Sequence, residues 1–347
     1  MPAAKPIQII GGGLAGLTLG LGLRQQKIPV TIQEAGHYPR HRVCGEFISG
    51  RGQASLARLG LNRPLENAGV IPARTAAFFT ATKSTPARLL PSSALCLSRF
   101  VLDELLAVAF QQLGGELITG RRWREGHFDE GTVHATGRRV QVEPEGERWF
   151  GLKMHARNVP LQADLELHLS PQGYVGLCKI PGGEVNICGI FRKRAGGKIS
   201  GPDARDFLRG NKDSLLNQRL AAAEFDKNSF CAVAGLSLHP QRAAAHGEIC
   251  IGDAITMIPP VTGNGMSMAF ESAELAAAPL AAWSRGEISW LEAKSKIARA
   301  CDEQFTRRLR WANWLQRFLL TPALQNPLVA FASRSDWFWR LAFERTR

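Results

Sequence analysis

A glycine-rich turn near the N-terminus constrains this chain most. The apolar run from Ile7 to Ile10 indicates a short buried strand, and it leads directly into the segment GGGLAGLTLG. Gly11, Gly13 and Gly16 have the spacing G-x-G-x-x-G after a strand and at the start of a helix. Glycines at these places allow a tight turn, close approach of a pyrophosphate and close packing of the helix on the strand. The turn therefore predicts a dinucleotide site with its phosphates at a helix N-terminus.

A second strand supports the same interpretation. Val30 to Gln33 is apolar in alternation and ends in Glu34, at the distance from the glycines where an acidic side chain accepts hydrogen bonds from a ribose. A glycine-rich packing helix alone would leave Glu34 unexplained. Strand, glycines, helix, strand and acid in this order predict a Rossmann-like domain of the α/β class.

The composition points to a globular protein with an anionic partner. Of the 347 residues, 45% are hydrophobic and 21% charged, and the formal net charge is +13. This charge favours a phosphate-bearing cofactor, a carboxylated or CoA-like substrate, an acidic protein or a membrane surface, with a merely solvated basic surface as the alternative. The arginines are scattered and no nucleic-acid motif accompanies them, so no nucleic-acid partner is expected.

Cysteine usage indicates a reducing compartment. The seven cysteines are odd in number and include no Cys-x-x-Cys pair. This pattern argues against a disulfide framework and against a cysteine zinc site, and we expect no metal and a cytoplasmic location. No segment has the length and apolar character of a transmembrane helix.

The stretch from Gly247 to Leu280 has the pattern of a second cofactor-binding segment. Its apolar run Ile249 to Ile251 indicates a buried strand that delivers Asp253. A rigid turn with Pro259–Pro260 follows, and a small-residue helix starts near Asn264. The Asp can accept from a hydroxyl, and the free N–H groups of the helix face an anion or an electron-rich ring.

The segment from His37 to Gly50 reads HYPRHRVCGEFISG. Cys44 follows Arg40, His41 and Arg42, and nearby positive charge lowers the pKa of a thiol. We therefore expect either a reactive thiol with a lowered pKa or a structural loop cysteine.

The triplet Cys44–Glu46, followed by Ile48 and Ser49, resembles the CGE segment of FAD-dependent enzymes of the geranylgeranyl reductase type. These belong to a superfamily with the aromatic hydroxylases and the flavin-dependent halogenases. The helix that opens at Arg99 and the segment Ala135–Arg139 also resemble cofactor-contacting parts of that superfamily. The resemblance covers roughly residues 6 to 285.

The resemblance implies that FAD lies extended, with adenosine near Glu34, the pyrophosphate over Gly11 to Gly16 and the flavin ring against Gly263 to Met266, at the helix that starts near Asn264. That helix N-terminus would stabilise negative charge on the reduced ring. Cys44 is the one side chain expected to take part in catalysis. The residues expected to bind FAD are Gly11, Gly13, Leu14, Ala15, Gly16, Glu34, Arg42, Cys44, Gly45, Arg99, Gly252, Asp253, Pro260, Gly263, Asn264, Gly265 and Met266.

The expected architecture is a Rossmann-like FAD-binding domain interleaved with an antiparallel β-sheet substrate domain, plus C-terminal helices. Alternating segments between Trp149 and Cys231 indicate the half-buried sheet, where His155, His168 and Lys179 are candidates to face the substrate or simply lie on the wet face. The expected boundaries are 1–69, 92–145 and 236–290 for the FAD-binding domain, 70–91 and 146–235 for the substrate domain, and 291–347 for the helices.

The C-terminal region interleaves arginines with aromatic residues, for example Trp311, Trp314 and Phe318 in the segment Cys301–Leu320. Such a pattern fits peripheral contact with an anionic membrane. The alternative is an aromatic face packed on the FAD-binding domain with the arginines in water.

The chain has one dinucleotide fingerprint, so electrons must come from transiently bound NAD(P)H or from a separate reductase. Pro259–Pro260 with Gly265–Met266 resembles the hydroxylases' P-P-x-x-G-x-G-M, in which a flavin C4a-hydroperoxide transfers oxygen. Cys44–Glu46 with Thr262–Gly263 resembles the reductases, in which flavin N5 delivers hydride to a double bond.

We expect a monooxygenase acting on a hydrophobic small molecule, such as a polyketide, an isoprenoid or an aromatic compound. An ene reductase and a non-enzymatic, membrane-associated FAD protein are the alternatives. Halogenation ranks third among the reactions, because the W-x-W-x-I-P segment and the lysine motif of the tryptophan halogenases are absent from the sequence.

Overall fold

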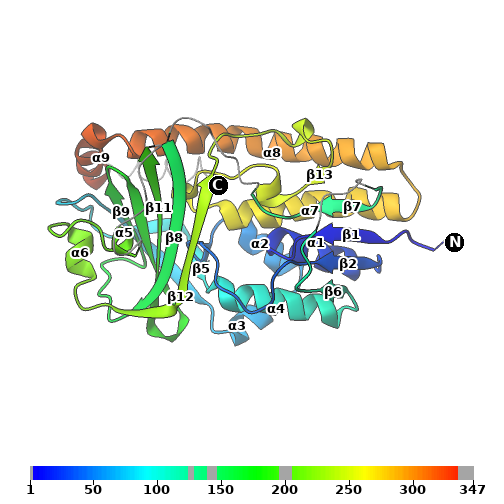
Figure 1. The fold of residues 1–347 in the computed structure, drawn as a ribbon, viewed down its shortest axis with the longest axis horizontal. Helices are drawn as coiled ribbons and strands as arrows, with labels where there is room; N and C mark the ends of the chain where they lie inside the picture. The colour runs from blue at the N-terminus through cyan, green and yellow to red at the C-terminus, as the bar shows by residue number, and fades with distance from the viewer. Residues whose placement is uncertain (1–2, 124–128, 139–146, 195–204, 335–347) are drawn as a thin grey trace.

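The computed structural model describes residues 3–123, 129–138, 147–194 and 205–334. Two sheets lie side by side, the smaller on the right of Figure 1 and the larger on the left, and one long helix runs along both. The smaller sheet and its helices are called the first lobe, and the larger sheet and its helices the second lobe.

The first lobe is built on a parallel sheet with the strand order β13-β7-β1-β2-β6. Ile7 and Ile9 of the central strand are fully buried, as expected for a parallel sheet that helices cover. The α/β, Rossmann-like architecture is therefore confirmed. The strands are β1 (Ile7–Ile10), β2 (Val30–Gln33), β6 (Glu116–Ile118), β7 (Thr132–His134) and β13 (Ile249–Cys250); the helices that pack around them are α1 (Leu14–Gln25), α4 (Arg99–Gln112) and α7 (Gly265–Ser284).

The second lobe is built on a sheet with the order β12-β8-β11-β10-β9-β4-β5-β3. The expected antiparallel sheet is confirmed with one exception, since β4 runs parallel to β9. β3 lies before the expected boundary at residue 69, yet it pairs with β5 in this sheet. The strands are β3 (Phe47–Ile48), β4 (Ile71–Phe79), β5 (Arg88–Cys96), β8 (Glu147–Arg157), β9 (Leu165–Ser170), β10 (Gly173–Ile180), β11 (Glu184–Arg194) and β12 (Glu224–Leu236).

The two faces of the large sheet have different roles. On β8, Phe150, Leu152 and Met154 pack in an apolar cluster with residues of the short helices beyond the sheet. Because side chains alternate along a strand, Lys153 and His155 point to the opposite face, toward the first lobe. We call the face that carries Lys153 and His155 the inner face.

Helix α8 (Trp290–Leu319) runs along both lobes at the top of Figure 1, and α9 (Pro322–Arg334) follows at the left end. The Ser289 hydroxyl caps α8 by accepting from the Glu292 amide. Glu271 of α7 accepts two hydrogen bonds from Arg308 of α8, at 2.7 and 3.0 Å. Both side chains are buried, so this pair fixes where α8 lies on the first lobe.

The remaining elements are short. The helical excursion expected from Asp203 to Phe225 is limited to two short helices, since β12 begins at Glu224. Most of the strand expected from Trp123 to Phe128, Arg139 and the last aromatic residues lie outside the described residues. The short helices are α2 (Arg51–Arg58), α3 (Asn62–Asn67), α5 (Asp206–Arg209) and α6 (Leu215–Arg219), with 3-10 turns η1 (Pro181–Gly183), η2 (Ala243–Ala245), η3 (Gly252–Ala254) and η4 (Pro260–Thr262).

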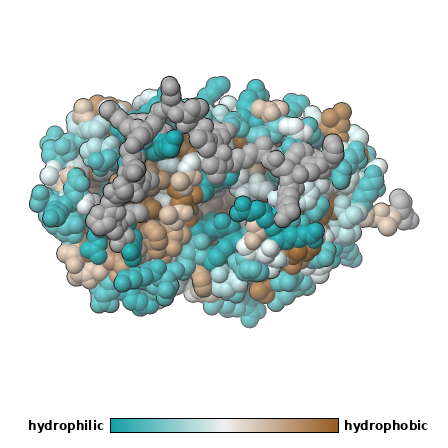
Figure 2. Space-filling view, in the orientation of Figure 1, coloured by the Kyte–Doolittle hydropathy of each residue, from teal (hydrophilic) through white to brown (hydrophobic). Residues whose placement is uncertain are grey.

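The surface seen in Figure 2 is mainly hydrophilic, with small scattered apolar patches. In the part of the chain that the structure describes, no helix is both long and apolar enough to cross a membrane.

Candidate functional site

The glycine turn between β1 and α1 is shaped by close backbone contacts. Gly11 has φ +107, and a Cβ there would lie 2.3 Å from the carbonyl oxygen of Ala135 on the strand side of the turn. A Cβ on Gly16 would lie 1.9 Å from the carbonyl oxygen of Gly11. Leu14 and Ala15 are buried in the first turn of α1. The fold itself therefore requires Gly11 and Gly16.

Glu34 organises this turn at the end of β2. Its carboxylate accepts from the amide of Gly12 at 2.8 Å, from the amide of Gly36 at 2.8 Å and from Arg40 Nη1 at 2.7 Å. Burial alone would raise the pKa of Glu34, but Arg40 and the two amides outweigh it and lower the pKa to about 2. The Tyr38 hydroxyl donates to the Gly12 carbonyl. Glu34 thus holds the turn, and its expected contact with a ribose stays a prediction.

Positive side chains gather beside the turn. Nε and Nη2 of Arg40 and Nε of Arg138 are buried and have no hydrogen-bond partner among the described residues. Arg42 is exposed, and its charge interacts with those of Arg40 and Arg138. Burial raises the pKa of Asp253 to about 6, while Arg138 and Arg99 act in the opposite direction. Asp253 thus lies among cations, directly after β13.

The start of α7 is tied to β3. Gly263 is left-handed with φ +66, and a Cβ there would lie 2.3 Å from the Phe47 ring. The Ser49 hydroxyl bonds to Asn264 Oδ1 at 3.0 Å, and Ser267 Oγ donates to the Ser49 carbonyl. The other expected residues of this stretch lie around it: Gly252 (φ +61) donates its amide to Ser272 Oγ at 2.8 Å, Pro260 begins η4, Gly265 begins α7, and Met266 is buried in the first turn.

The structure corrects the expectation for Cys44. Burial raises the pKa of the Cys44 thiol, and the guanidinium of Arg99 opposes this rise without overcoming it. Two of the three neighbours in sequence do not supply the expected charge. Burial and Lys153 lower the pKa of His41 to about 4, so that His41 is neutral near pH 7, and Arg40 is paired with Glu34.

Arg99 is held at the start of α4. Its guanidinium makes two hydrogen bonds to Asp103, at 2.6 and 2.8 Å, and its backbone amide donates to Glu46 Oε1 at 2.9 Å. Gly45, also expected to bind the cofactor, packs against Phe47, because a Cβ on Gly45 would lie 3.0 Å from that ring. The expected residues Cys44, Gly45 and Arg99 are therefore adjacent.

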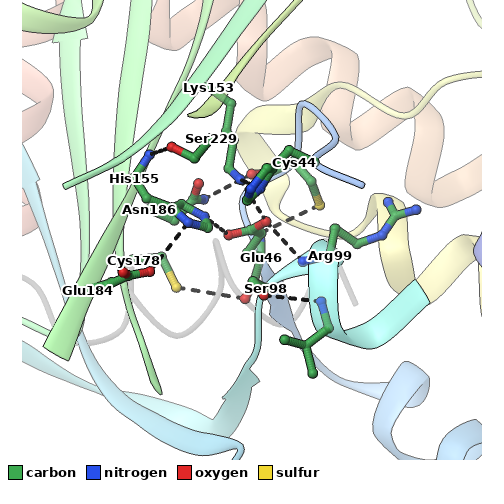
Figure 3. A network of polar contacts seen from close by, with 12 residues as sticks. Cys44, Glu46, Ser98, Arg99, Lys153, His155, Cys178, Glu184, Asn186 and Ser229 are labelled. Carbon is green, nitrogen blue, oxygen red and sulfur yellow. Dashed lines mark hydrogen bonds and ion pairs between the residues drawn. The ribbon is translucent and has the colours of Figure 1, made fainter. Parts of the chain in front are cut away.

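A buried polar network joins the two lobes at Glu46 (Figure 3). Glu46 Oε1 lies 3.1 Å from Lys153 Nζ, and Oε2 lies 2.7 Å from His155 Nε2. Both charged side chains, Glu46 and Lys153, are 0% exposed. Burial alone would raise the pKa of Glu46, but the hydrogen bond from His155 and the charge of Lys153 outweigh it and hold the pKa below its usual range.

The network extends to the edges of the junction. Lys153 Nζ lies 3.0 Å from His41 Nδ1, and His155 Nδ1 lies 3.5 Å from Glu184 Oε2. Asn186 donates to the Cys44 carbonyl at 2.9 Å (Figure 3). Glu46 itself has φ +60, a conformation that few non-glycine residues adopt. These contacts fix the conformation of the Cys44–Glu46 turn.

Of the three sheet residues named as candidates to face the substrate, only His155 lies on the inner face. Phe79 of β4 stacks on His168, which lies on the opposite face of the sheet with its Nε2 2.9 Å from Glu166. Lys179 is exposed. Lys153 was missed, although a lysine amid the apolar alternation of β8 is a signal that it has a buried partner.

An apolar cluster adjoins this network on the inner face. We call it the inner apolar cluster, and it brings together the large sheet, the turn before α7 and the end of α8. The Tyr174 hydroxyl within it is buried and has no partner among the described residues. Its members include Trp149, Leu167, Leu169, Tyr174, Ile190, Val233, Met257, Val261, Leu315, Phe318, Leu319 and Leu320.

We expect the Glu34 contacts to make stability depend on acid. A folded-state pKa near 2, below the ordinary 4.5, stabilises the fold above pH about 4.5, and this contribution is lost as the pH falls toward 2. The wild type should lose about 2 kcal/mol more than Glu34→Gln between pH 6 and pH 3, measured by denaturant unfolding. An equal loss in both proteins would contradict the assignment.

We expect Lys153→Met to destabilise the protein by about 3–5 kcal/mol at pH 7, because it leaves the Glu46 carboxylate buried without its cation. Denaturant unfolding measures the change. The matched control Lys179→Met, at an exposed position of the same sheet, should stay within about 0.5 kcal/mol. Adding Glu46→Gln to Lys153→Met should recover part of the loss; a further loss would show that the charge pair is not the cause.

Comparisons with known proteins agree with this architecture. The family model described as squalene epoxidase matches residues 145–315. The myxobacterial chondrochloren halogenase CndH is 18% identical, with a TM-score of 0.74 over 100% of this chain and 91% of that one. A flavoprotein/dehydrogenase from Cytophaga hutchinsonii is 14% identical, with a TM-score of 0.76 over 98% and 92%.

PqsL of Pseudomonas aeruginosa, described as a probable FAD-dependent monooxygenase, is 15% identical, with a TM-score of 0.70 over 94% of this chain and 100% of that one. The conditioned medium factor receptor 1 of Dictyostelium discoideum is 22% identical over an alignment of 320 residues that covers 79% of this chain. The chain spans 62% of the length of that relative. The chain thus has the fold of the flavin-dependent monooxygenases and halogenases, and the resemblance to their superfamily is confirmed.

Proposed function

We propose that this protein is an FAD-dependent oxidoreductase, and that it acts as a monooxygenase on an apolar small molecule. The observation that carries the proposal is the space beside Gly13. A Cβ on Gly13 would meet nothing within 4 Å, and its φ of −85 is open to any residue. The fold does not require glycine there, whereas a diphosphate lying against the helix N-terminus does.

The cations beside the turn fit the same group. The buried nitrogens of Arg40 and Arg138 that have no partner among the described residues are donors suited to a diphosphate. An unpaired buried donor is costly, and an anionic ligand would remove that cost. Arg42 and Asp253 would lie beside the same turn, toward the phosphates and the ribityl hydroxyls.

The start of α7 fits the flavin end. Asn264 makes no side-chain cap to α7, and a Cβ on Gly265 would find open space to 3.9 Å. The N–H groups of the first turn of α7, from Gly265 on, would face a negative ring edge. When bound, the flavin would supply the redox chemistry, with electrons from NAD(P)H or a separate reductase. The inner apolar cluster would exclude water and hold an apolar substrate.

A second candidate is the reduction of a carbon–carbon double bond. The raised pKa of Cys44 keeps its thiol protonated near neutral pH. A protonated thiol at the Cys44–Glu46 turn could donate the proton that such a reduction consumes.

We expect Gly13→Ala to lower FAD affinity at least about tenfold while changing the free energy of unfolding by less than about 1 kcal/mol, because its new methyl group enters only the space proposed for the diphosphate. FAD fluorescence titration and denaturant unfolding measure the two quantities. The matched variant Gly11→Ala should destabilise the fold itself, since its Cβ meets backbone. Full FAD affinity in Gly13→Ala would refute the proposed binding mode.

We expect the purified protein to be yellow and to bleach with NAD(P)H or a reductase. Stopped-flow mixing with oxygen should then show a transient species before the oxidised flavin spectrum returns. Two results together would favour the reductase. With oxygen, the oxidised flavin spectrum would return in a single step, and without oxygen it would return when the alkene geranylgeraniol is added. Under the reductase reading, Cys44→Ala should slow that anaerobic step and keep FAD bound. A colourless protein that FAD does not bind would rule out both.

A further inference from the structure

A groove of about 820 Å³ runs along α8, beside η2. Its size is that of a small-molecule site. Five of the side chains that line it are cations, Arg242, Lys294, Arg299, Arg307 and Arg310, against the two anions Asp302 and Glu303.

The two carboxylate side chains of the groove already have hydrogen-bond donors within the protein. Asp302 accepts from Arg242 Nε at 3.3 Å and from the Ala243 amide at 2.7 Å. Glu303 accepts from Arg299 Nε at 2.8 Å. Lys294 donates to a backbone carbonyl at 2.5 Å. After these two ion pairs the groove keeps the charges of Lys294, Arg307 and Arg310, and of these three only the two arginines make no hydrogen bond among the described residues.

Arg307 and Arg310 lie three residues apart, so they are neighbours on one face of α8. Both are exposed, and among the described residues neither makes an ion pair or a hydrogen bond. Two like charges at this spacing repel each other by a few tenths of a kcal/mol, and nothing in the described chain relieves this. Guanidinium pairs of this kind match the oxygens of a carboxylate or phosphate.

A stack of aromatic rings begins at Trp311, one turn after Arg307 on α8. The rings of Trp311 and Trp314 have centroids 4.9 Å apart, and those of Trp314 and Phe318 lie 5.4 Å apart at an interplanar angle of 9°. Trp314 is 50% exposed, whereas Phe318 packs against the inner apolar cluster. The stack therefore leads from the surface to the interior over about 16 Å from Arg307.

We propose that this end of the groove and the aromatic stack form a binding site for an amphipathic anion, in which Arg307 and Arg310 hold the charged head and Trp314 and Phe318 hold the apolar body. This inference deepens the proposed function, because it names the class of substrate that would reach the inner apolar cluster. Arg307 and Arg310 line a concave groove, and Trp314, which lies beyond that lining on the same helix, is an exposed ring. This arrangement fits a small molecule better than a membrane, which a broad apolar face would contact.

Calorimetric titration of the flavin-containing protein with dodecyl phosphate and with dodecanoate, both below their micelle concentrations, tests the site. Both should bind, and dodecanol and inorganic phosphate should each bind at least about tenfold more weakly, because each lacks one half of the recognised structure. The two anions separate a phosphate preference from a carboxylate preference.

The double variant Arg307→Gln/Arg310→Gln should weaken binding of the preferred anion at least about tenfold. The matched control Arg285→Gln/Lys296→Gln removes the same charge outside the groove and should stay within about twofold. Trp314→Ala should weaken binding of the anion and of dodecanol alike. All these positions are exposed, and thermal unfolding verifies that the variants fold.

Equal binding by the wild type and the arginine variant would overturn the proposal. So would binding to vesicles of equimolar phosphatidylcholine and phosphatidylglycerol without binding to either dissolved anion, which would make this face a membrane surface. Flavin absorbance of each sample keeps the two proposals separate. A colourless protein whose anion binding depends on the arginines would refute the proposal of FAD binding and support the anion site. A yellow protein without arginine-dependent anion binding would refute only the anion site.

Discussion

The arrangement of the two lobes depends on one buried carboxylate. Glu46 directly precedes β3 and lies fully buried at the junction, where Lys153 and His155 of β8 reach it from the large sheet and the Arg99 amide of α4 reaches it from the first lobe. An unpaired carboxylate there would cost several kcal/mol, so the inner face of the sheet must keep its cation in place. The turn that carries Cys44 therefore has a conformation set from both lobes.

The polar groups of the candidate site differ in whether they have hydrogen-bond partners within the chain. Glu34 is satisfied by the chain itself, through two amides and Arg40, so it stabilises the glycine turn whether or not a ligand is present. The remaining nitrogens of Arg40, and Nε of Arg138, have no such partners among the described residues. Satisfied groups build the fold, whereas unsatisfied ones indicate where an anion fits.

Helix α8 joins the first lobe to the inner apolar cluster. Its buried arginine, Arg308, pairs with Glu271 of the first lobe, while Arg307 and Arg310 on another face of the same helix are left in water. The end of α8 contributes Phe318 to the inner apolar cluster. One helix thus both closes the interior and offers a route of charged and aromatic side chains toward it.

The sequence by itself determined the local features, namely the strand and glycine turn at Gly11, the acid at Glu34 and the helix start near Asn264, because each depends on residues that are near in sequence. Only the tertiary structure decided the rest. The orientation of His168 on the outer face of the sheet and the raised pKa of Cys44 depend on burial in the folded chain. The pairing of Lys153 with Glu46 joins residues more than a hundred positions apart in the sequence. Desolvation acts on whatever the folded chain encloses, and no spacing along the sequence reports it.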